Sequence, residues 1–303
     1  MQQNQSGILI IDKPANISSA RVVARIKKAL GARKAGHAGT LDPFATGVMV
    51  CCINQATRLA RFFLHSEKTY RAVLRLGITT DTQDLTGNVI AHCGTTDFPD
   101  KKLRSVFSEF EGRLQQHPPA FSALKYKGIP LYKLARKGTP VQKPPRSIHI
   151  SSIEIIKIDL PEICFEVTCS AGTYIRTLCA DIGARLGCGG HLRELRRTRS
   201  SGFDIENAIG LEEFEEIARS GQAADLMIQM NNALYKMPEY TADTVLKQKI
   251  MTGQTIGAEN ITAAALTGPG NLVKIVDEDA NLLAVLQLKQ KCRKLEYCCV
   301  FHP

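Results

Sequence analysis

The sequence predicts an α+β protein with one large domain and a small β-rich domain at its C-terminus. From Gly7 to about residue 231, apolar runs and alternating stretches that indicate strands are interleaved with amphipathic stretches that indicate helices. From about Asn232 the pattern changes to short strands separated by turn residues. A chain of 303 residues is long enough for both units. We therefore place the domains at residues 1–231 and 232–303.

Strands are predicted in the large domain from five apolar or alternating segments. These are residues 7–11, 48–53, 68–76, 148–158 and 163–169. In the third segment the alternation places Tyr70 on the same face as Ala72 and Leu74, which by itself favours a core tyrosine. In the small domain we expect three strands, at residues 273–276, 282–288 and 297–301. A hairpin turn at Asp277–Asn281 would join the first two.

Helices are predicted where apolar residues recur every three or four positions and capping residues mark the ends. Ser18 or Ser19 can cap a helix that ends before Gly31. Asn54 can cap a short helix that runs to Leu64. Three further helices are expected: one that begins at Phe98–Asp100, one that ends near Leu186–Gly187 and one that carries the acidic surface Glu212–Glu216.

The segment Gly36–Val48, GHAGTLDPFATGV, stands out by its small residues. Such residues let a backbone turn tightly and let a ligand approach it closely. The segment holds one carboxylate, Asp42, and the following Pro43 biases that residue away from the helical region. Because a buried strand follows at once, we expect Asp42 on a shaped loop that enters the core. The simpler alternative is an Asp-Pro turn in which Asp42 bonds its own backbone.

The composition favours a polyanionic partner and argues against a secreted or membrane protein. The chain has 39 Lys and Arg against 29 Asp and Glu, which gives a net charge of +10. No apolar run approaches the roughly 18 residues of a membrane span. The polar N-terminus lacks the pattern of a signal peptide. We therefore expect a cytoplasmic protein.

The ten cysteines do not indicate a disulfide framework, because the chain is long and shows no signal peptide. Most of them lie in apolar patterns, so we expect buried, reduced thiols, as at Cys51, Cys52, Cys164 and Cys179. One C-terminal group could be imagined as a zinc site: Cys292, Cys298, Cys299 and His302. Its spacing fits no common zinc module, and we expect no metal site.

Basic residues concentrate in two long segments. Residues 115–146 combine Pro, Lys and Arg with Tyr126 and Tyr132, which suits contact with an RNA backbone; an ordinary surface excursion is the alternative. Residues 191–200, HLRELRRTRS, would as a charge run usually lie on a solvated face. Arg33 and Lys34 precede the Asp42 loop, where they could form a solvated face or hold phosphates.

Several of these segments resemble motifs of the bacterial TruB-type tRNA pseudouridine synthases. Gly36–Val48 is similar to that family's GHxGxLDPxATG loop, which carries its nucleophilic aspartate. Four more segments resemble family motifs in the same order along the chain: 67–82, 118–138, 171–178 and 191–200. The resemblance covers about residues 7–203 and implies the pseudouridine synthase fold, with a mixed, mostly antiparallel central sheet and flanking helices. The C-terminal unit resembles, more weakly, the PUA-like module appended to this family.

The resemblance implies that the chain isomerises the T-loop uridine of tRNA, position 55, to pseudouridine after flipping the base. It makes Asp42 the nucleophile and Arg176 its charge partner. It also assigns binding roles to four residues: His37 holds the RNA with the base extruded, Tyr70 stacks on the base and is a candidate for removing the C5 proton, and Tyr174 and Leu195 line the pocket. Residues 115–146 correspond to the family's RNA-gripping thumb.

The reaction breaks N1–C1′, turns the base and forms C5–C1′, and it needs neither a metal nor a cofactor. A carboxylate can act in it covalently or as a base. Whether Asp42 attacks C1′, attacks C6 or first takes the C2′ proton stays open at this point. The thumb disfavours a guide-RNA-dependent synthase of ribosomal RNA, and the intact Asp42, Tyr70 and Arg176 disfavour a tRNA-binding or tRNA-folding protein on the same scaffold. We expect tRNA as the partner, no guide RNA, and a monomer.

Overall fold

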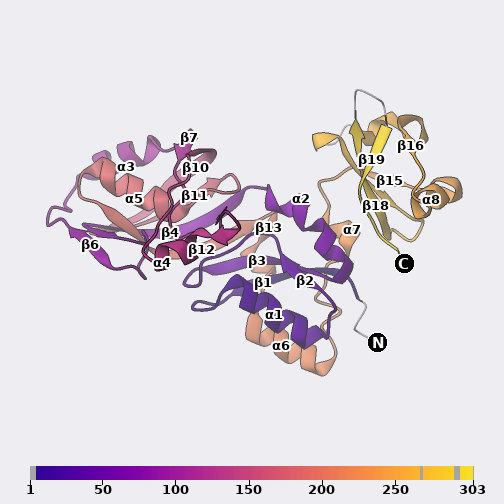
Figure 1. Ribbon diagram of the computed structural model, residues 1–303, viewed down its shortest axis with the longest axis horizontal. Helices are drawn as coiled ribbons and strands as arrows, with labels where there is room; N and C mark the ends of the chain where they lie inside the picture. Colours follow the sequence, from indigo (N-terminus) through magenta and orange to yellow (C-terminus); the bar gives the residue numbers. More distant parts are fainter. Residues whose placement is uncertain (1–4, 267–268, 290–293, 303) are drawn as a thin grey trace.

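A computed structural model of the chain describes residues 5–266, 269–289 and 294–302. Figure 1 shows a large unit built around one long sheet and a small β-rich unit beside it. The large sheet has the strand order β14-β1-β3-β12-β4-β11-β10-β7, with β2 beside β3 and β13 beside β12. Its strands are β1 (Gly7–Lys13), β2 (Ala35–His37), β3 (Thr46–Ile53), β4 (Lys68–Leu76), β7 (Gly112–Gln116), β10 (Arg146–Asp159), β11 (Glu162–Cys169), β12 (Gly190–Ser200), β13 (Phe203–Asp204) and β14 (Ile209–Gly210).

Most neighbouring strands of this sheet run antiparallel. Within the described residues, the parallel pairs are β1–β14 and β3–β12. The predicted mixed, mostly antiparallel sheet is therefore confirmed, and so are the five strands expected from apolar runs and alternation.

Helices cover the sheet in two groups. They are α1 (Ser19–Leu30), α2 (Ala60–Leu64), α3 (Asp100–Ser108), α4 (Leu131–Arg136), α5 (Ile175–Leu186), α6 (Leu211–Ser220) and α7 (Met230–Ala233). Helices α1 and α6 pack on β1 and β3 through residues such as Ile26 and Phe214. Helices α3 and α5 pack on the β4–β12 half through residues such as Phe107 and Ile182. This division into two helix-covered halves is visible in Figure 1. The Asp42 loop ends at Thr46, which pairs with Arg196 of β12, so the loop lies where the two halves meet.

Local signals for the helix ends were mostly correct. The Ser18 hydroxyl accepts a hydrogen bond from the Arg21 amide, and Gly31 adopts φ 60°, a left-handed conformation that glycine reaches without strain. The prediction that Asn54 caps the next helix was wrong. Asn54 begins the short 3-10 helix Asn54–Leu59 with φ 51°, and its side-chain oxygen accepts hydrogen bonds from the Arg33 and Lys34 amides. The residue therefore fastens the turn before β2.

The basic segment 115–146 leaves the sheet after β7 and returns at β10. It contains the two-stranded hairpin of β8 (Lys125–Tyr126) and β9 (Ile129–Pro130), followed by α4. Its cations form cation–π contacts with tyrosines of the same segment: Lys127 and Lys143 lie over Tyr126, and Arg136 lies over Tyr132. The segment leaves the sheet as a small folded element, with short local structure that the sequence did not indicate. Its contact with RNA stays a prediction.

The basic run 191–200 does not form the solvated face that its charges suggested. It is strand β12, which lies between β3 and β4 inside the sheet. Its pairing with β4 is shifted at two points, between Leu192 and Glu194 and between Arg197 and Arg199. Between these shifts Leu195 and Arg197 lie on one face and are buried, whereas Arg193 and Arg199 are exposed. The face that each residue takes in this central strand is therefore set by its pairing with the neighbouring strands, and not by its charge.

The C-terminal unit is a five-stranded sheet in the order β15-β17-β18-β19-β16, with α8 (Thr244–Met251) beside it. Its strands are β15 (Glu239–Thr241), β16 (Ile256–Gly257), β17 (Leu272–Val276), β18 (Leu282–Lys289) and β19 (Lys294–Val300). Val276, Leu282 and Phe301 share an apolar cluster with Ile8 and Phe63 of the large unit. A β-rich C-terminal unit is thus confirmed, and the boundary at residues 231 and 232 stays a prediction.

The described residues can be compared with what the composition suggested about membrane spans and cysteines. None of the helices in these ranges is long and apolar enough to span a membrane. The nine described cysteines are free thiols; Cys51, Cys52 and Cys179 are buried, whereas Cys164 is only partly buried. Cys292, the first member of the imagined zinc group, lies outside the described residues, and no cluster of metal-ligating side chains occurs among those described.

Candidate active site

Asp42 lies on the loop between β2 and β3, as the Asp-Pro pair and the following apolar run predicted. The loop closes with a hydrogen bond from the Ala45 amide to the Asp42 carbonyl, 3.1 Å long. At its end Gly47 has φ 105°, and a Cβ there would lie 2.2 Å from the Arg197 carbonyl oxygen. Glycine is therefore required where β3 comes alongside β12.

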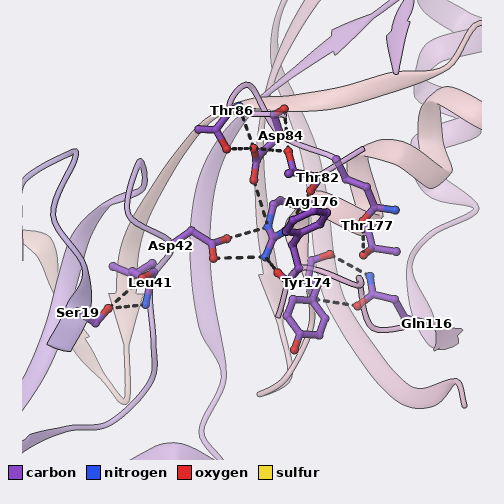
Figure 2. Close-up of polar contacts among 12 residues, drawn as sticks. Ser19, Leu41, Asp42, Thr82, Asp84, Thr86, Gln116, Tyr174, Arg176 and Thr177 are labelled. Carbon is purple, nitrogen blue, oxygen red and sulfur yellow. Dashed lines mark hydrogen bonds and ion pairs between the residues drawn. The ribbon is translucent and has the colours of Figure 1, made fainter. Parts of the chain in front are cut away.

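The Asp42 carboxylate meets the guanidinium of Arg176, the second residue of α5 (Figure 2). Nε of Arg176 donates to Oδ2 over 2.8 Å, and Nη2 donates to Oδ1 over 3.3 Å. This is the two-point geometry that makes arginine–carboxylate pairs strong and well oriented. The Asp42 side chain keeps 33% of its surface exposed, so a substrate can still reach it. The alternative in which the carboxylate bonds only its own backbone is wrong.

Arg176 is buried, and three groups besides the Asp42 carboxylate orient its guanidinium. It donates to the carbonyls of Thr82 and Phe121 over 3.0 and 2.8 Å. Its Nε also lies 3.6 Å from Oδ2 of Asp84, a buried carboxylate. Oδ1 of Asp84 in turn accepts hydrogen bonds from the Thr82 hydroxyl and from the hydroxyl and amide of Thr86 (Figure 2). One guanidinium thus bridges two carboxylates, of which only Asp42 is partly exposed.

The near side of the Asp42 loop is fastened by β1 and α1. The Ser19 hydroxyl donates to the Leu41 carbonyl and accepts from the Leu41 amide, each over 2.9 Å. The ammonium of Lys13, which is fully buried, donates to the Pro43 carbonyl over 3.0 Å. Burial lowers the pKa of Lys13 to about 8, and the negative charge of Asp42 opposes that shift.

Arg197 fastens the loop from β12. It is 1% exposed, and its Nε and Nη2 donate to the carbonyls of Val48 and Gly39 over 2.7 and 3.2 Å. Its hydrogen bonds therefore join both ends of the segment that carries Asp42. A buried guanidinium without a carboxylate partner is costly unless its donors are satisfied, and here main-chain carbonyls satisfy them.

Tyr70 and Leu195 lie on the Asp42 side of the sheet. They belong to one apolar cluster, together with Leu41 from the loop. Tyr70 is paired in register with Arg197 across β4 and β12. Burial raises the pKa of Tyr70, and the nearby Arg197 guanidinium opposes this shift. The structure thus places Tyr70 and Leu195 in one apolar cluster with a residue of the Asp42 loop, and their roles at the base stay predictions.

His37 and Tyr174 come from the two elements next to the ion pair, namely β2, which precedes the Asp42 loop, and α5, which carries Arg176. His37 ends β2, and its Nδ1 is buried with no hydrogen-bond partner in the described part of the chain. Burial, followed by the charge of Arg197, lowers the pKa of His37. Tyr174 precedes α5; its amide donates to Oε1 of Gln116 over 2.8 Å, and its carbonyl accepts from Nε2 over 3.0 Å (Figure 2).

Sequence reasoning missed Asp84, Arg197, Lys13 and Ser19. A signal for Asp84 was available, because an Asp followed two residues later by Thr is typical of a side chain that accepts the Thr amide. Arg197 lies two positions after Leu195 and so shares its face in a strand. No local signal indicated Lys13 or Ser19, since their partners are 30 and 22 residues away along the chain.

This arrangement fits covalent or base chemistry by a single carboxylate. The Asp42 carboxylate is paired with a guanidinium, and contacts from Lys13, Ser19 and Arg197 fix its loop. Tyr70 and apolar side chains belong to the same cluster as Leu41 of that loop. Asp84 is buried beside Arg176, which leaves Asp42 as the more exposed carboxylate of the two.

Comparison with known proteins identifies the family. Residues 27–175 match the description "TruB family pseudouridylate synthase (N terminal domain)", and residues 176–237 match "tRNA pseudouridylate synthase B C-terminal domain". The chain belongs to the TruB family. It is therefore a pseudouridine synthase, and the Asp42 loop lies within the matched N-terminal domain.

Curated relatives cover most of this TruB-family chain. It is 43% identical over 262 residues to a "tRNA pseudouridine synthase B" of Geobacter sulfurreducens, with 86% of each chain covered. It is 43% identical over 274 residues to the protein of the same name from Syntrophotalea carbinolica, covering 88% of this chain and 89% of that one. A chain in the "Crystal Structure of a Cbf5-Nop10-Gar1 Complex" shares the fold with a TM-score of 0.76 and 28% identity, covering 98% of this chain and 85% of that one. The predicted pseudouridine synthase fold is confirmed.

Proposed function

We propose that this TruB-family chain converts the uridine at position 55 in the T-loop of tRNA to pseudouridine, with Asp42 as the nucleophile. The observation that carries the proposal is the two-point pair of Asp42 and Arg176 on a partly exposed loop. A guanidinium favours the ionised form of a carboxylate, which is the form that can act as nucleophile or base.

The neighbouring side chains supply what an extruded uridine needs. A nucleotide must leave the RNA stack before its glycosidic bond can be reached, and its base then needs a ring and apolar walls around it. Tyr70 would stack on the base, and the side chains of Leu195 and Tyr174 would line the pocket around it. His37, whose buried Nδ1 lacks a partner among the described residues, is positioned to bind the RNA that holds the base out. Arg176 stabilises the anionic Asp42 throughout.

Charge and relatives support tRNA as the partner. The chain carries a net charge of +10, and its basic thumb segment, residues 115–146, exposes most of its lysines. The curated relatives with about 43% identity are named for tRNA. We propose that the chain acts on tRNA without a guide RNA, as a cytoplasmic monomer, and without a metal or cofactor.

The test is incubation of the purified protein with an unmodified tRNA transcript, followed by mapping of pseudouridine along the product. We expect one pseudouridine, in the T-loop, with the same yield when EDTA is present. A transcript with cytidine at that position is the matched control and should stay unmodified. Modification only at other positions, a requirement for an added guide RNA, or loss of activity on chelation would contradict the proposal.

A further inference from the structure

Arg146 is the first residue of β10 and lies where the thumb segment rejoins the sheet. It pairs in register with Gln116 of β7, the residue that fastens Tyr174. Its guanidinium stacks on the Tyr174 ring, with 4.6 Å between Cζ and the ring centroid. Gly172 leaves the space for this stack: a Cβ there would lie 3.2 Å from Cζ, and the φ of 89° also favours glycine. The Arg146 guanidinium therefore lies between the Tyr174 ring and the backbone at Gly172.

No described residue neutralises this cation. Within the described ranges Arg146 forms no ion pair and no side-chain hydrogen bond, and its Nε is buried without a partner. The other two guanidiniums of the site differ, because Arg176 and Arg197 donate to carboxylates or carbonyls of the chain. An unsatisfied buried donor costs stability, so a donor kept in that state points to a ligand that satisfies it.

We propose that Arg146 binds a phosphate of the tRNA backbone next to the uridine that is modified. The inference rests on the proposed function, which makes tRNA the ligand. A guanidinium stacked on a ring keeps the donors of its edge free, and its planar fork matches phosphate oxygens. Tyr174, on which it stacks, is two residues from Arg176, so the bound phosphate would lie close to the Asp42 pocket.

The test compares Arg146→Met with Arg113→Met. Methionine keeps the apolar stem over Tyr174 and removes the charge and the donors. Arg113 is an exposed arginine on β7, three residues from Gln116 and hence on the opposite face of the strand, so its replacement removes the same charge elsewhere. The Kd of unmodified tRNA is measured from low to moderate salt, and single-turnover pseudouridine formation is measured at saturating protein.

We expect Arg146→Met to weaken tRNA binding about tenfold, as for the loss of one charge-assisted hydrogen bond. The slope of log Kd against log salt should become shallower by about 0.7–0.9, the value for one phosphate contact. Arg113→Met should keep the wild-type Kd. The rate at saturating protein should fall less than about threefold, because a binding contact acts mainly on affinity.

Two results would overturn the assignment. A Kd for Arg146→Met equal to that for Arg113→Met would mean that Arg146 only packs on Tyr174. A weaker Kd with an unchanged salt slope would mean a contact with a base, not a phosphate. If Arg146→Met does not fold, Arg146→Lys replaces it: its ammonium cannot stack as a planar fork, so the Kd should rise, and an unchanged Kd would refute the proposal. Failure of the proposed function would appear differently, as a wild-type protein that forms no pseudouridine.

Discussion

Replacing Asp84 with Asn should slow pseudouridine formation while leaving tRNA affinity unchanged. Oδ1 of Asp84 already accepts three hydrogen bonds, from the Thr82 hydroxyl and from the amide and hydroxyl of Thr86. The amide can keep those bonds with its oxygen, which places its NH2 group 3.6 Å from Nε of Arg176, where Oδ2 now lies. Two donors then face each other, and Arg176 loses one of the charges that orient it toward Asp42.

The distance gives the size of the effect. Two unit charges 3.6 Å apart attract by about 4–5 kcal/mol at an effective dielectric constant of about 20, before any desolvation cost is subtracted. Arg176 retains Asp42 and two carbonyl acceptors, so only part of this energy is lost. We expect the free energy of unfolding to fall by about 1–3 kcal/mol. The single-turnover rate should fall about 10- to 100-fold, which corresponds to about 1.4–2.7 kcal/mol in the barrier.

The assay is release of tritium from C5 of uridine in labelled tRNA, with protein in excess, because C5–C1′ bond formation displaces that hydrogen. Asp81→Asn is the matched control. Asp81 and Asp84 both lie in the connection between β5 (Ile78–Thr80) and β6 (Val89–His92), but the Asp81 carboxylate binds only Asn88 among the described residues. A folded Asp84→Asn protein as fast as Asp81→Asn would refute the idea that Asp84 orients Arg176.

Three further predictions concern the loop, the thumb and a buried lysine. Arg197→Met should lower both thermal stability and the single-turnover rate, because the carbonyls of Gly39 and Val48 lose their donor; an unchanged rate in the folded variant would count against a role for Arg197 in holding the loop. Replacing Tyr126–Lys143 with a short glycine linker should leave the sheet folded in circular dichroism, because the cations of this segment stack on tyrosines of the same segment. The variant should bind tRNA more weakly, and its Kd should depend less on salt. Unfolding, or an unchanged Kd and salt slope, would contradict this reasoning. Lys13 should make the free energy of unfolding rise with pH between about 8 and 10.5, because its ammonium loses a proton near pH 8 in the folded protein but only near pH 10.5 in the unfolded chain. The slope should reach up to about 1.4 kcal/mol per pH unit. Denaturant titrations of Lys13→Met should lack this slope.

Features that depend on residues close together in the sequence were predictable. Alternation along residues 68–76 predicted β4 and placed Tyr70 with the apolar residues, because successive strand side chains point to opposite faces. The Asp-Pro pair predicted that Asp42 lies outside a helix, because proline restricts the residue before it. The acidic stretch near Glu212 belongs to α6, also as expected.

Features that depend on distant partners were not predictable in the same way. Arg176 and Thr82 are 94 residues apart, and Arg197 and Gly39 are 158 apart, so no local pattern could show that they meet. The charge of residues 191–200 suggested a solvated face, but burial in β12 is set by its neighbours β3 and β4. Strands β15 and β16 were missed because two or three residues are too few to show a period.

The most direct test of the central claim compares Asp42→Asn with the wild-type protein on unmodified tRNA. The amide has almost the shape of the carboxylate and leaves the loop contacts of Ser19, Lys13 and Arg197 in place, but it can act neither as a nucleophile nor as a base. The account predicts that pseudouridine formation disappears while the Kd for tRNA changes little, because binding comes mainly from phosphate contacts elsewhere. Turnover within tenfold of the wild-type rate would contradict the assignment of Asp42 as the nucleophile.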